Sequence, residues 1–232
     1  MIPKKIHYCW FGKGEKPKLA LKCIESWRKY CPDYEIIEWN EDSFDINMNG
    51  YTKMCYENKK YAFLSDYVRL LVVAKCGGVY FDTDVELLKP LDDMLSNEAY
   101  FGFESNEFVN TGLGFGSVAK GIAIETMVKE YDALLSGEKG VEMCPKLNTN
   151  ALKKLGLNTD GSYQLLGNTA IYPADYFNPY ESATGRLRKT ENTISVHWYS
   201  AAWMSKKSKL RKTITKPLHR IFGVDAFKRF RK

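Results

Sequence analysis

The sequence lacks the features that would place it in several specialised classes of protein. No stretch approaches the roughly 18 uncharged apolar residues that a membrane-spanning helix needs. No apolar segment of about 7–15 residues follows the first lysines, so we do not expect export through a signal peptide. Internal repeats and low-complexity linkers are also missing. These absences leave a single globular domain, or one domain with a short appendage, as the expected organisation.

Paired cysteines are missing as well. None of the six cysteines forms a Cys-x-x-Cys pair, which argues against a zinc knuckle and against a disulfide scaffold. We expect them to be small core residues in a reducing compartment. They are Cys9, Cys23, Cys31, Cys55, Cys76 and Cys144.

The charge is distributed unevenly along the 232 residues. The net charge is +6, but the last 27 residues, 206–232, contain eleven Lys and Arg against one acid, Asp225, so they carry +10 and the remainder −4. We therefore expect a catalytic domain over 1–203 and a basic amphipathic tail over 204–232. Basic and apolar residues alternate in this tail, a composition typical of a segment that lies on an anionic membrane surface.

Strand and helix patterns alternate along the first half of the chain. Helices are predicted between Pro17 and Pro32, over 59–76 and over 121–135, from apolar stripes near the 3.6-residue period. This order indicates an α/β domain with a mostly parallel sheet. The predicted strands are 5–11, 34–39, 79–81, 100–104, 162–166 and 193–198.

Two carboxylates follow the predicted strand 79–81. Asp82 and Asp84 are two residues apart, so in extended chain they project to the same face. Together they can bind one hard divalent cation. Ligands of open α/β sheets bind at the carboxyl ends of strands, where this pair lies. The alternative is a pair of solvated loop aspartates, although the context Gly77-Gly78-Val79-Tyr80-Phe81 is more specific than the triplet alone.

Asp66 and Arg69 interrupt the otherwise apolar helix 59–76. They are three residues apart and so share one side of the helix. They form either an internal ion pair or two groups that face a ligand, with Asp66 accepting hydrogen bonds from sugar hydroxyls and Arg69 pairing with phosphate or a carboxylate.

Three segments carry a resemblance to a known family. Residues 2–12 (IPKKIHYCWFG), Ser65-Asp66-Tyr67-Val68-Arg69 and Gly77 to Asp84 resemble the family 32 glycosyltransferases, whose sugar-binding region contains a DXD motif. The resemblance implies a GT-A, Rossmann-type fold and a nucleotide-sugar donor. It also implies Mn²⁺ or Mg²⁺ at the DXD acids and retention of anomeric configuration.

The resemblance also implies roles for residues that match the family's motifs. Trp10 matches the position near the nucleobase, and Tyr80 matches an aromatic residue next to the nucleotide. Asp82 matches the first DXD acid, which contacts the ribose and the metal. Asp84 matches the acid that binds the metal directly.

Further positions match less specific features of the family. Asp66 and Arg69 match the pair that contacts the donor sugar. His197 is the best match for a third metal ligand, with a satisfied core histidine as the alternative, and Asn110 resembles a polar residue near the donor. Trp203 sits where the family often has a tryptophan, as a core or lid residue.

These inferences combine into one functional hypothesis. The chain is expected to be a retaining, metal-dependent transferase that moves a hexose, from UDP-hexose in the first instance, to a glycan or a lipid-linked oligosaccharide. A bridging divalent ion would stabilise the charge on the departing diphosphate. No residue after strand 100–104 stands out as a nucleophile, which favours a front-side route. We expect the enzyme in the cytoplasm, peripheral to the membrane, in surface polysaccharide or capsule synthesis.

Two hypotheses from other classes compete with this one. A metal-dependent nucleotide-sugar phosphohydrolase would also use Asp82 and Asp84, but it would need more ligands than three histidines readily supply. A nucleic-acid-binding protein would use the basic tail, but the acidic body disfavours nucleic acid as a partner.

Overall fold

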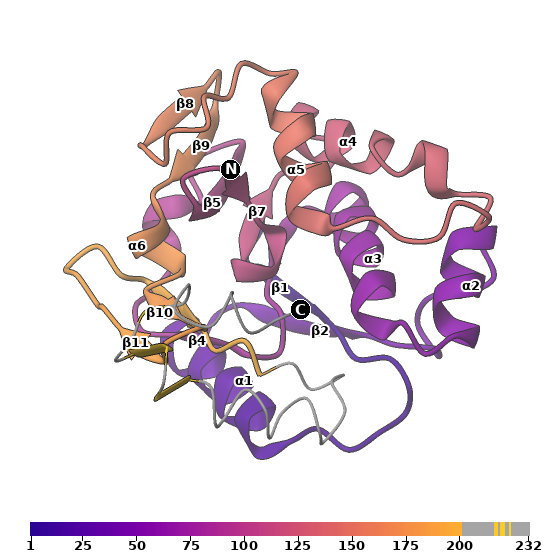
Figure 1. Ribbon diagram of the computed structural model, residues 1–232, viewed down its shortest axis with the longest axis horizontal. Coiled ribbons are helices and arrows are strands. Elements are labelled where there is room, and N and C mark those ends of the chain that lie inside the picture. The colour runs from indigo at the N-terminus through magenta and orange to yellow at the C-terminus, as the bar shows by residue number, and fades with distance from the viewer. Residues whose placement is uncertain (201–215, 218, 221–222, 224–232) are drawn as a thin grey trace.

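The computed structural model describes residues 1–200, 216, 217, 219, 220 and 223. Its centre is a sheet whose strands follow the order β2-β1-β3-β7-β5-β9-β8, with β6 paired to β5 (Figure 1). The strands of this sheet are β1 (Lys5–Cys9), β2 (Glu35–Trp39), β3 (Gly78–Tyr80), β5 (Ala99–Ser105), β6 (Phe108–Val109), β7 (Phe115–Ser117), β8 (Gln164–Leu166) and β9 (Thr169–Tyr172).

Most strands of the sheet run in one direction. β1 pairs in parallel with β2 and β3, and β5 pairs in parallel with β9. β7 lies antiparallel between β3 and β5, so β5 has the same direction as β3. Only β6, β7 and β8 run against the other five described strands. The α/β class with a mostly parallel sheet is therefore confirmed.

Helices cover both faces of the sheet and enclose two apolar cores. On one face, α1 (Lys18–Tyr30) and α6 (Ala174–Phe177) pack on a core that includes Trp27, Phe81 and Phe177. On the other face, a second core includes Val68, Phe101 and Leu152. The helices that contribute to this second core are α2 (Gly50–Glu57), α3 (Tyr61–Cys76), α4 (Ile122–Lys129) and α5 (Cys144–Lys153).

The turn from α3 into β3 explains the two consecutive glycines. Gly77 and Gly78 have φ values of +62° and +116°, a region that residues with a Cβ rarely adopt. A Cβ on Gly78 would also lie 2.9 Å from the carbonyl oxygen of Lys5. This turn returns the chain directly from α3 to the middle of the sheet and thereby places the segment after β3 beside α3.

A second, two-stranded sheet joins distant parts of the chain. β4 (Val85–Leu87) pairs antiparallel with β12 (Ser195–His197), and His197 lies opposite Val85. A short hairpin of β10 (Tyr180–Glu181) and β11 (Arg186–Leu187) precedes β12. The predicted strand 193–198 is therefore present over 195–197, but it belongs to this small sheet and brings His197 next to Asp84.

Other elements differ from the sequence-based predictions. The helix predicted over 121–135 ends at Lys129 and is followed by a 3₁₀ turn, Asp132–Leu134. The pattern did not predict α2, α5, β4 or β9. All six cysteines are free thiols, and all are buried except the half-buried Cys76. Trp203, and the predicted tail 204–232 apart from five positions, lie outside the described residues.

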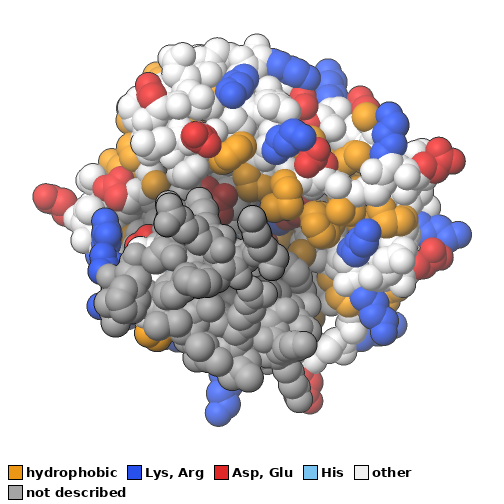
Figure 2. All heavy atoms as spheres, in the orientation of Figure 1, with side chains coloured by type: hydrophobic (Ala, Val, Ile, Leu, Met, Phe, Trp, Pro, Cys, Tyr) orange, Lys and Arg blue, Asp and Glu red, His pale blue; other side chains and the backbone are white. Residues whose placement is uncertain are grey.

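The surface of the described residues shows no strong segregation of charge on the visible face. Lys and Arg side chains are scattered there among Asp and Glu (Figure 2). Hydrophobic side chains gather in a band across the middle of this face (Figure 2). No helix among the described residues is long and apolar enough to span a bilayer.

Candidate active site

The two acids of the DXD motif lie between β3 and β4. Asp84 is fixed by the segment that follows β12: the Ser200 amide donates to Asp84 Oδ2 at 2.7 Å, and the Trp198 amide donates to the Asp84 carbonyl at 2.9 Å. The pairing of β4 with β12 and these two hydrogen bonds hold Asp84 in place. The residues that provide them lie more than 100 positions later in the chain.

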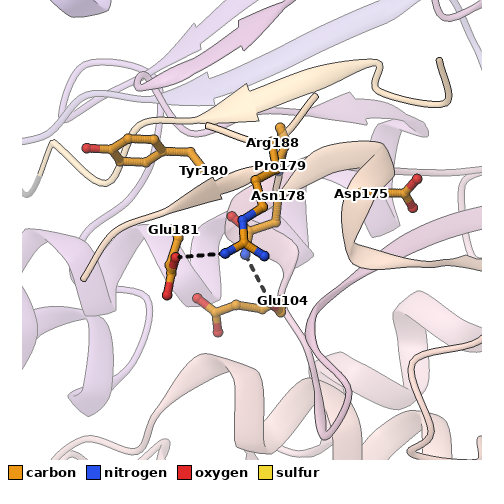
Figure 3. A pocket seen from close by; sticks show the side chains of 7 residues that line it. All are labelled: Glu104, Asp175, Asn178, Pro179, Tyr180, Glu181 and Arg188. Carbon is orange, nitrogen blue, oxygen red and sulfur yellow. Dashed lines mark hydrogen bonds and ion pairs between the residues drawn. The ribbon is translucent and has the colours of Figure 1, made fainter. Parts of the chain in front are cut away.

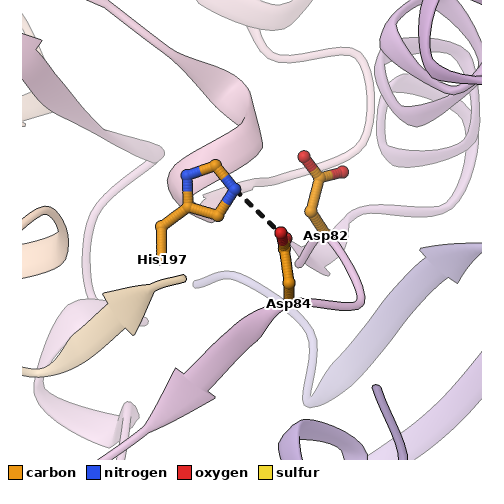
Figure 4. A group of neighbouring side chains, drawn as sticks. All are labelled: Asp82, Asp84 and His197. Carbon is orange, nitrogen blue, oxygen red and sulfur yellow. Dashed lines mark ion pairs between the residues drawn. The ribbon is translucent and has the colours of Figure 1, made fainter. Parts of the chain in front are cut away.

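His197 completes a cluster with the two acids. Its Nε2 lies 3.1 Å from Asp84 Oδ1, and Figure 4 shows the three side chains facing one space. One ligand atom from each of Asp82, Asp84 and His197 lies within 4.8 Å of the others. The sequence-based metal ligands therefore meet at one place in the fold.

α3 places an ion-pair network beside this cluster. Arg69 pairs with Asp66 through Nη2, and its Nη1 lies 3.4 Å from Asp82 Oδ2. Its Nε donates to the Ser65 carbonyl at 3.2 Å, and its side chain is 3% exposed. The internal ion pair between Asp66 and Arg69 that we considered from the sequence is present. It forms part of the site because Arg69 also pairs with Asp82.

The charges of the site leave a negative excess. Asp66, Asp82 and Asp84 carry three carboxylates against one guanidinium, so two negative charges remain when His197 is neutral. Burial raises the pKa of Asp66 to about 6, even though Arg69 opposes the shift. Burial also raises the pKa of Asp82, and Asp84 adds to the shift. An excess of two negative charges in a largely buried site matches the charge of a divalent cation.

Asp84 and His197 stabilise each other's charged forms. Burial would raise the pKa of Asp84, but His197 and the Ser200 hydrogen bonds outweigh it and hold that pKa well below its usual value. Burial would lower the pKa of His197, but Asp84 and then Asp82 outweigh it and raise that pKa. Asp84 is thus ionised at neutral pH, as a metal ligand must be, whereas His197 has to give up its added proton when it binds a metal ion.

The donor atoms fit a divalent metal ion. Carboxylates suit Mg²⁺ and Mn²⁺, and imidazole is a common additional ligand of transition metals. His197 is buried, and its Nδ1 has no hydrogen-bond partner among the described residues. Two acids and one imidazole with close ligand atoms therefore form a set that could hold Mn²⁺ or Mg²⁺.

A glycine loop brings Asn110 to the acids. Asn110 Oδ1 accepts from the Gly112 amide at 2.7 Å. A Cβ on Gly112 would lie 2.7 Å from Asp82 Oδ2, 3.0 Å from Arg69 Nη1 and 3.1 Å from Asn110 Oδ1. Gly112 faces these site residues, whereas the nearby Gly114 faces Phe81 and Gly116 faces Tyr100.

α5 supports this loop from behind, which the sequence did not reveal. Asn148 Nδ2 donates to Thr111 Oγ1 at 3.0 Å, and Cys144 Sγ lies 3.3 Å from the same hydroxyl. Pro145 near the start of α5 is the local signal that could have predicted the helix. The contacts of Cys144 and Asn148 with Thr111 could not be predicted from a local pattern, because they join positions more than 30 residues apart.

The two aromatic candidates occupy different places. Tyr80 is 1% exposed, and its hydroxyl donates to Asp82 Oδ1 at 3.1 Å, so it lies behind the acid. Trp10 is half-buried just after β1, and its Nε1 donates to the Gly14 carbonyl at 2.6 Å. Trp10 and Asp82 both follow strands that run in parallel, so they lie along the same edge of the sheet.

Comparison with known proteins identifies the central segment of the site. Residues 17–101 match the family described as "Glycosyltransferase sugar-binding region containing DXD motif". This range contains Asp66, Arg69, Tyr80, Asp82 and Asp84. The resemblance inferred from the sequence is therefore confirmed over this segment, and with it the expectation of a glycosyltransferase family domain.

Two curated relatives match part of the chain. "Subversion of eukaryotic traffic protein A" of Legionella pneumophila is 30% identical over 129 residues, which cover 44% of this chain and 20% of that protein. "Inositol phosphoceramide mannosyltransferase 3" of Schizosaccharomyces pombe is 30% identical over 103 residues, which cover 43% of this chain and 29% of that protein. The chain spans less than a third of the length of either relative.

The fold is similar to that of a solved glycosyltransferase. The structure titled "PaToxG Glycosyltransferase" superposes with a TM-score of 0.52 at 20% identity, over 66% of this chain and 69% of that one. This similarity concerns the fold alone. It confirms the expected GT-A architecture.

Proposed function

We propose that the chain transfers a hexosyl group from a nucleotide sugar to a hydroxyl acceptor, with Mn²⁺ or Mg²⁺ held by Asp82, Asp84 and His197. The observation that carries this proposal is the convergence of these three side chains within 4.8 Å beside the parallel strand ends. The matching family segment and the mannosyltransferase relative support it.

The residues around the metal ligands have distinct tasks in this proposal. A bound cation would stabilise the negative charge on the departing diphosphate. The Ser200 amide fixes the orientation of Asp84, and the Tyr80 hydroxyl fixes that of Asp82. Arg69 links Asp82 to Asp66 and keeps these like charges together in a largely buried site.

The donor would lie along the edge of the sheet that carries both Trp10 and the acids. Trp10 is proposed to contact the base, with UDP as the expected nucleotide. The Asp66 side chain is 16% exposed, and we propose that it accepts hydrogen bonds from the donor sugar. Asn110 lies close enough to Asp82 to act near the same sugar. Retention of configuration by a front-side route is part of this proposal.

We also propose an acceptor class and a location. The name of the yeast relative refers to mannosyl transfer and to a lipid, inositol phosphoceramide, which supports an acceptor linked to a lipid, here a lipid-linked glycan. A domain over 1–203 and a basic tail over 204–232 that binds an anionic membrane would place the enzyme at the cytoplasmic face, in surface polysaccharide or capsule synthesis. Sedimentation with anionic liposomes, compared between the full chain and a chain ending at 203, tests this location. Equal sedimentation of both would contradict it.

The activity itself is tested with a panel of nucleotide sugars and Mn²⁺. Asp84→Asn keeps the size of the side chain but removes the charge, so we expect turnover to fall roughly 10³-fold, as for the loss of several kcal/mol of metal stabilisation. The control is Asp93→Asn, which changes an exposed acid in the 3₁₀ turn Asp92–Met94 and should turn over as the wild type does. Undiminished turnover in Asp84→Asn would refute the proposal.

The same assay separates a transferase from a phosphohydrolase. A transferase hydrolyses the donor slowly, and an added acceptor diverts the sugar to a new glycoside. A phosphohydrolase releases the same products whether or not an acceptor is added. Retention is read from the anomeric configuration of the product glycoside.

A further inference from the structure

A polar cavity lies outside the segment that matches the glycosyltransferase family. Its volume is about 330 Å³, and its lining includes Glu104, Asn178, Glu181 and Arg188. Figure 3 shows Glu104, Glu181 and Arg188 pointing toward one another, whereas the carboxylate of Asp175 points away. The volume falls in the range of about 300–1,000 Å³ that small-molecule sites occupy.

Tyr199 joins this cavity to the metal-ligand cluster. Its ring centroid lies 4.0 Å from that of His197. Its hydroxyl donates to Glu104 Oε1 at 2.9 Å and lies 3.0 Å from Asn178 Oδ1. Asn178 Nδ2 in turn donates to the Glu104 carbonyl at 2.9 Å. Three contacts therefore link Glu104 to Asp84, through Tyr199 and His197.

The backbone at Tyr199 is strained where it makes this connection. Its φ is +49°, in the left-handed region that bulky residues rarely adopt. The turn lets the next amide, that of Ser200, reach Asp84 while the Tyr199 side chain reaches Glu104. Strain of this kind persists where the surrounding contacts impose it, commonly at functional sites. One turn thus fixes both a metal-binding acid and the wall of the cavity.

The cavity offers both kinds of hydrogen-bonding group. Glu104 and Glu181 supply acceptors, and Arg188 supplies donors, a combination that matches sugar hydroxyls because each hydroxyl both donates and accepts. Arg188 and Glu181 are 4.0 Å apart, with side chains 71% and 44% exposed. An exposed ion pair at this distance contributes little to stability, so ligand hydroxyls can replace it at low cost.

We propose that this cavity binds the acceptor sugar of the transfer, an inference that rests on the proposed function. Glu104 and Arg188 bind hydroxyls of a neutral sugar, and Tyr199 is a positioning residue that orients Glu104. Tyr199 connects the cavity to His197 in the metal cluster, whereas Asp66 and Arg69 lie beside Asp82.

The test measures binding of simple glycosides to the full-length protein. The probes are the methyl glycosides of mannose, glucose and galactose, detected by saturation-transfer NMR and titrated to obtain Kd. We expect at least one to bind the wild type. Arg188→Ala and Glu104→Gln should each weaken that binding about tenfold, the effect of losing a hydrogen bond to a charged group.

The matched control is Lys189→Ala, which removes an exposed cation next to Arg188 and should bind the glycoside as the wild type does. Failure of all three glycosides to bind, or unchanged affinity in both Arg188→Ala and Glu104→Gln, would overturn the inference. Hydrolysis of a nucleotide sugar by the wild type, measured without glycoside, reports on the proposed function separately. Glycoside binding without such hydrolysis would contradict the proposed function but would still support a sugar-binding site in this cavity.

Discussion

A methyl group added at Gly112 should disable the site while leaving the fold intact. The Cβ of Gly112→Ala would lie 2.7 Å from Asp82 Oδ2, 3.0 Å from Arg69 Nη1 and 3.1 Å from Asn110 Oδ1. All three distances are shorter than an ordinary van der Waals contact, so the acid and the guanidinium must move by several tenths of an ångström. Misplacement on the order of 1 Å costs about 10²-fold in rate, and overpacking costs about 1–3 kcal/mol of stability.

The assay compares kcat for nucleotide-sugar turnover with the thermal midpoint of unfolding. Gly156→Ala is the control, because Gly156 has φ +99° with no atom within 4 Å of the added Cβ, and it follows α5 at the end away from Thr111. It should lose about 1–2 kcal/mol of stability through backbone strain and keep wild-type kcat. Wild-type kcat in Gly112→Ala would refute the placement of Asp82 and Gly112 in one site.

Three further predictions concern the residues around the site. Arg69→Lys keeps the charge but cannot bridge Asp66 and Asp82, so kcat should fall about tenfold or more; unchanged kcat contradicts the bridging role. Asn148→Ala removes the donor to Thr111 Oγ1 at 3.0 Å and should lower stability by about 1–3 kcal/mol in urea unfolding, a loss that Asn150→Ala, on the exposed side of α5, should not reproduce. His7 Nδ1 accepts from Trp39, Nε2 lies 2.9 Å from the Gly77 carbonyl oxygen, and burial lowers the pKa of His7 below 6.5. As the pH falls, the unfolded chain takes up a proton on His7 before the folded chain does. The stability due to neutral His7 is therefore complete above about pH 6.5 and declines as the pH falls below that value. His7→Gln should flatten this decline in the midpoint of urea unfolding, and an equally steep decline in the variant would contradict the role of His7.

The parts of the site that the sequence predicted depend on short-range patterns. Asp82 and Asp84 follow a buried strand and are two residues apart, which predicted two acids at the strand end that can bind one cation, and the family resemblance implied the metal. The three-residue spacing of Asp66 and Arg69 predicted that they share one side of α3. The spacing of Asp66 and Arg69 could not decide between an internal ion pair and a ligand contact, because Arg69 also reaches Asp82, in the segment between β3 and β4.

The contacts that shape the rest of the site join distant positions. Ser200 and Asp84 are 116 residues apart, and Tyr199 and Glu104 are 95 apart, so no local pattern reports them. His197 was found through the family resemblance, whereas its pairing opposite Val85 depends on β4, a three-residue strand that is too short to stand out in the sequence.

Some missed elements did carry a readable signal. Asn49 and Thr52 form a reciprocal capping box at the start of α2. Such a pair could have predicted that helix from the sequence. The helix predicted over 121–135 ends at Lys129. The chain then continues through Glu130 and Tyr131 into the 3₁₀ turn Asp132–Leu134.

The most direct measurement of the central claim is anomalous diffraction from crystals of this protein grown with Mn²⁺ and a non-hydrolysable nucleotide sugar. We expect one strong manganese peak bound by carboxylate oxygens of Asp82 and Asp84 and a nitrogen of His197, with the diphosphate on the open side of the ion. Manganese bound elsewhere, or a diphosphate seated with no ion between it and these two acids, would contradict the account.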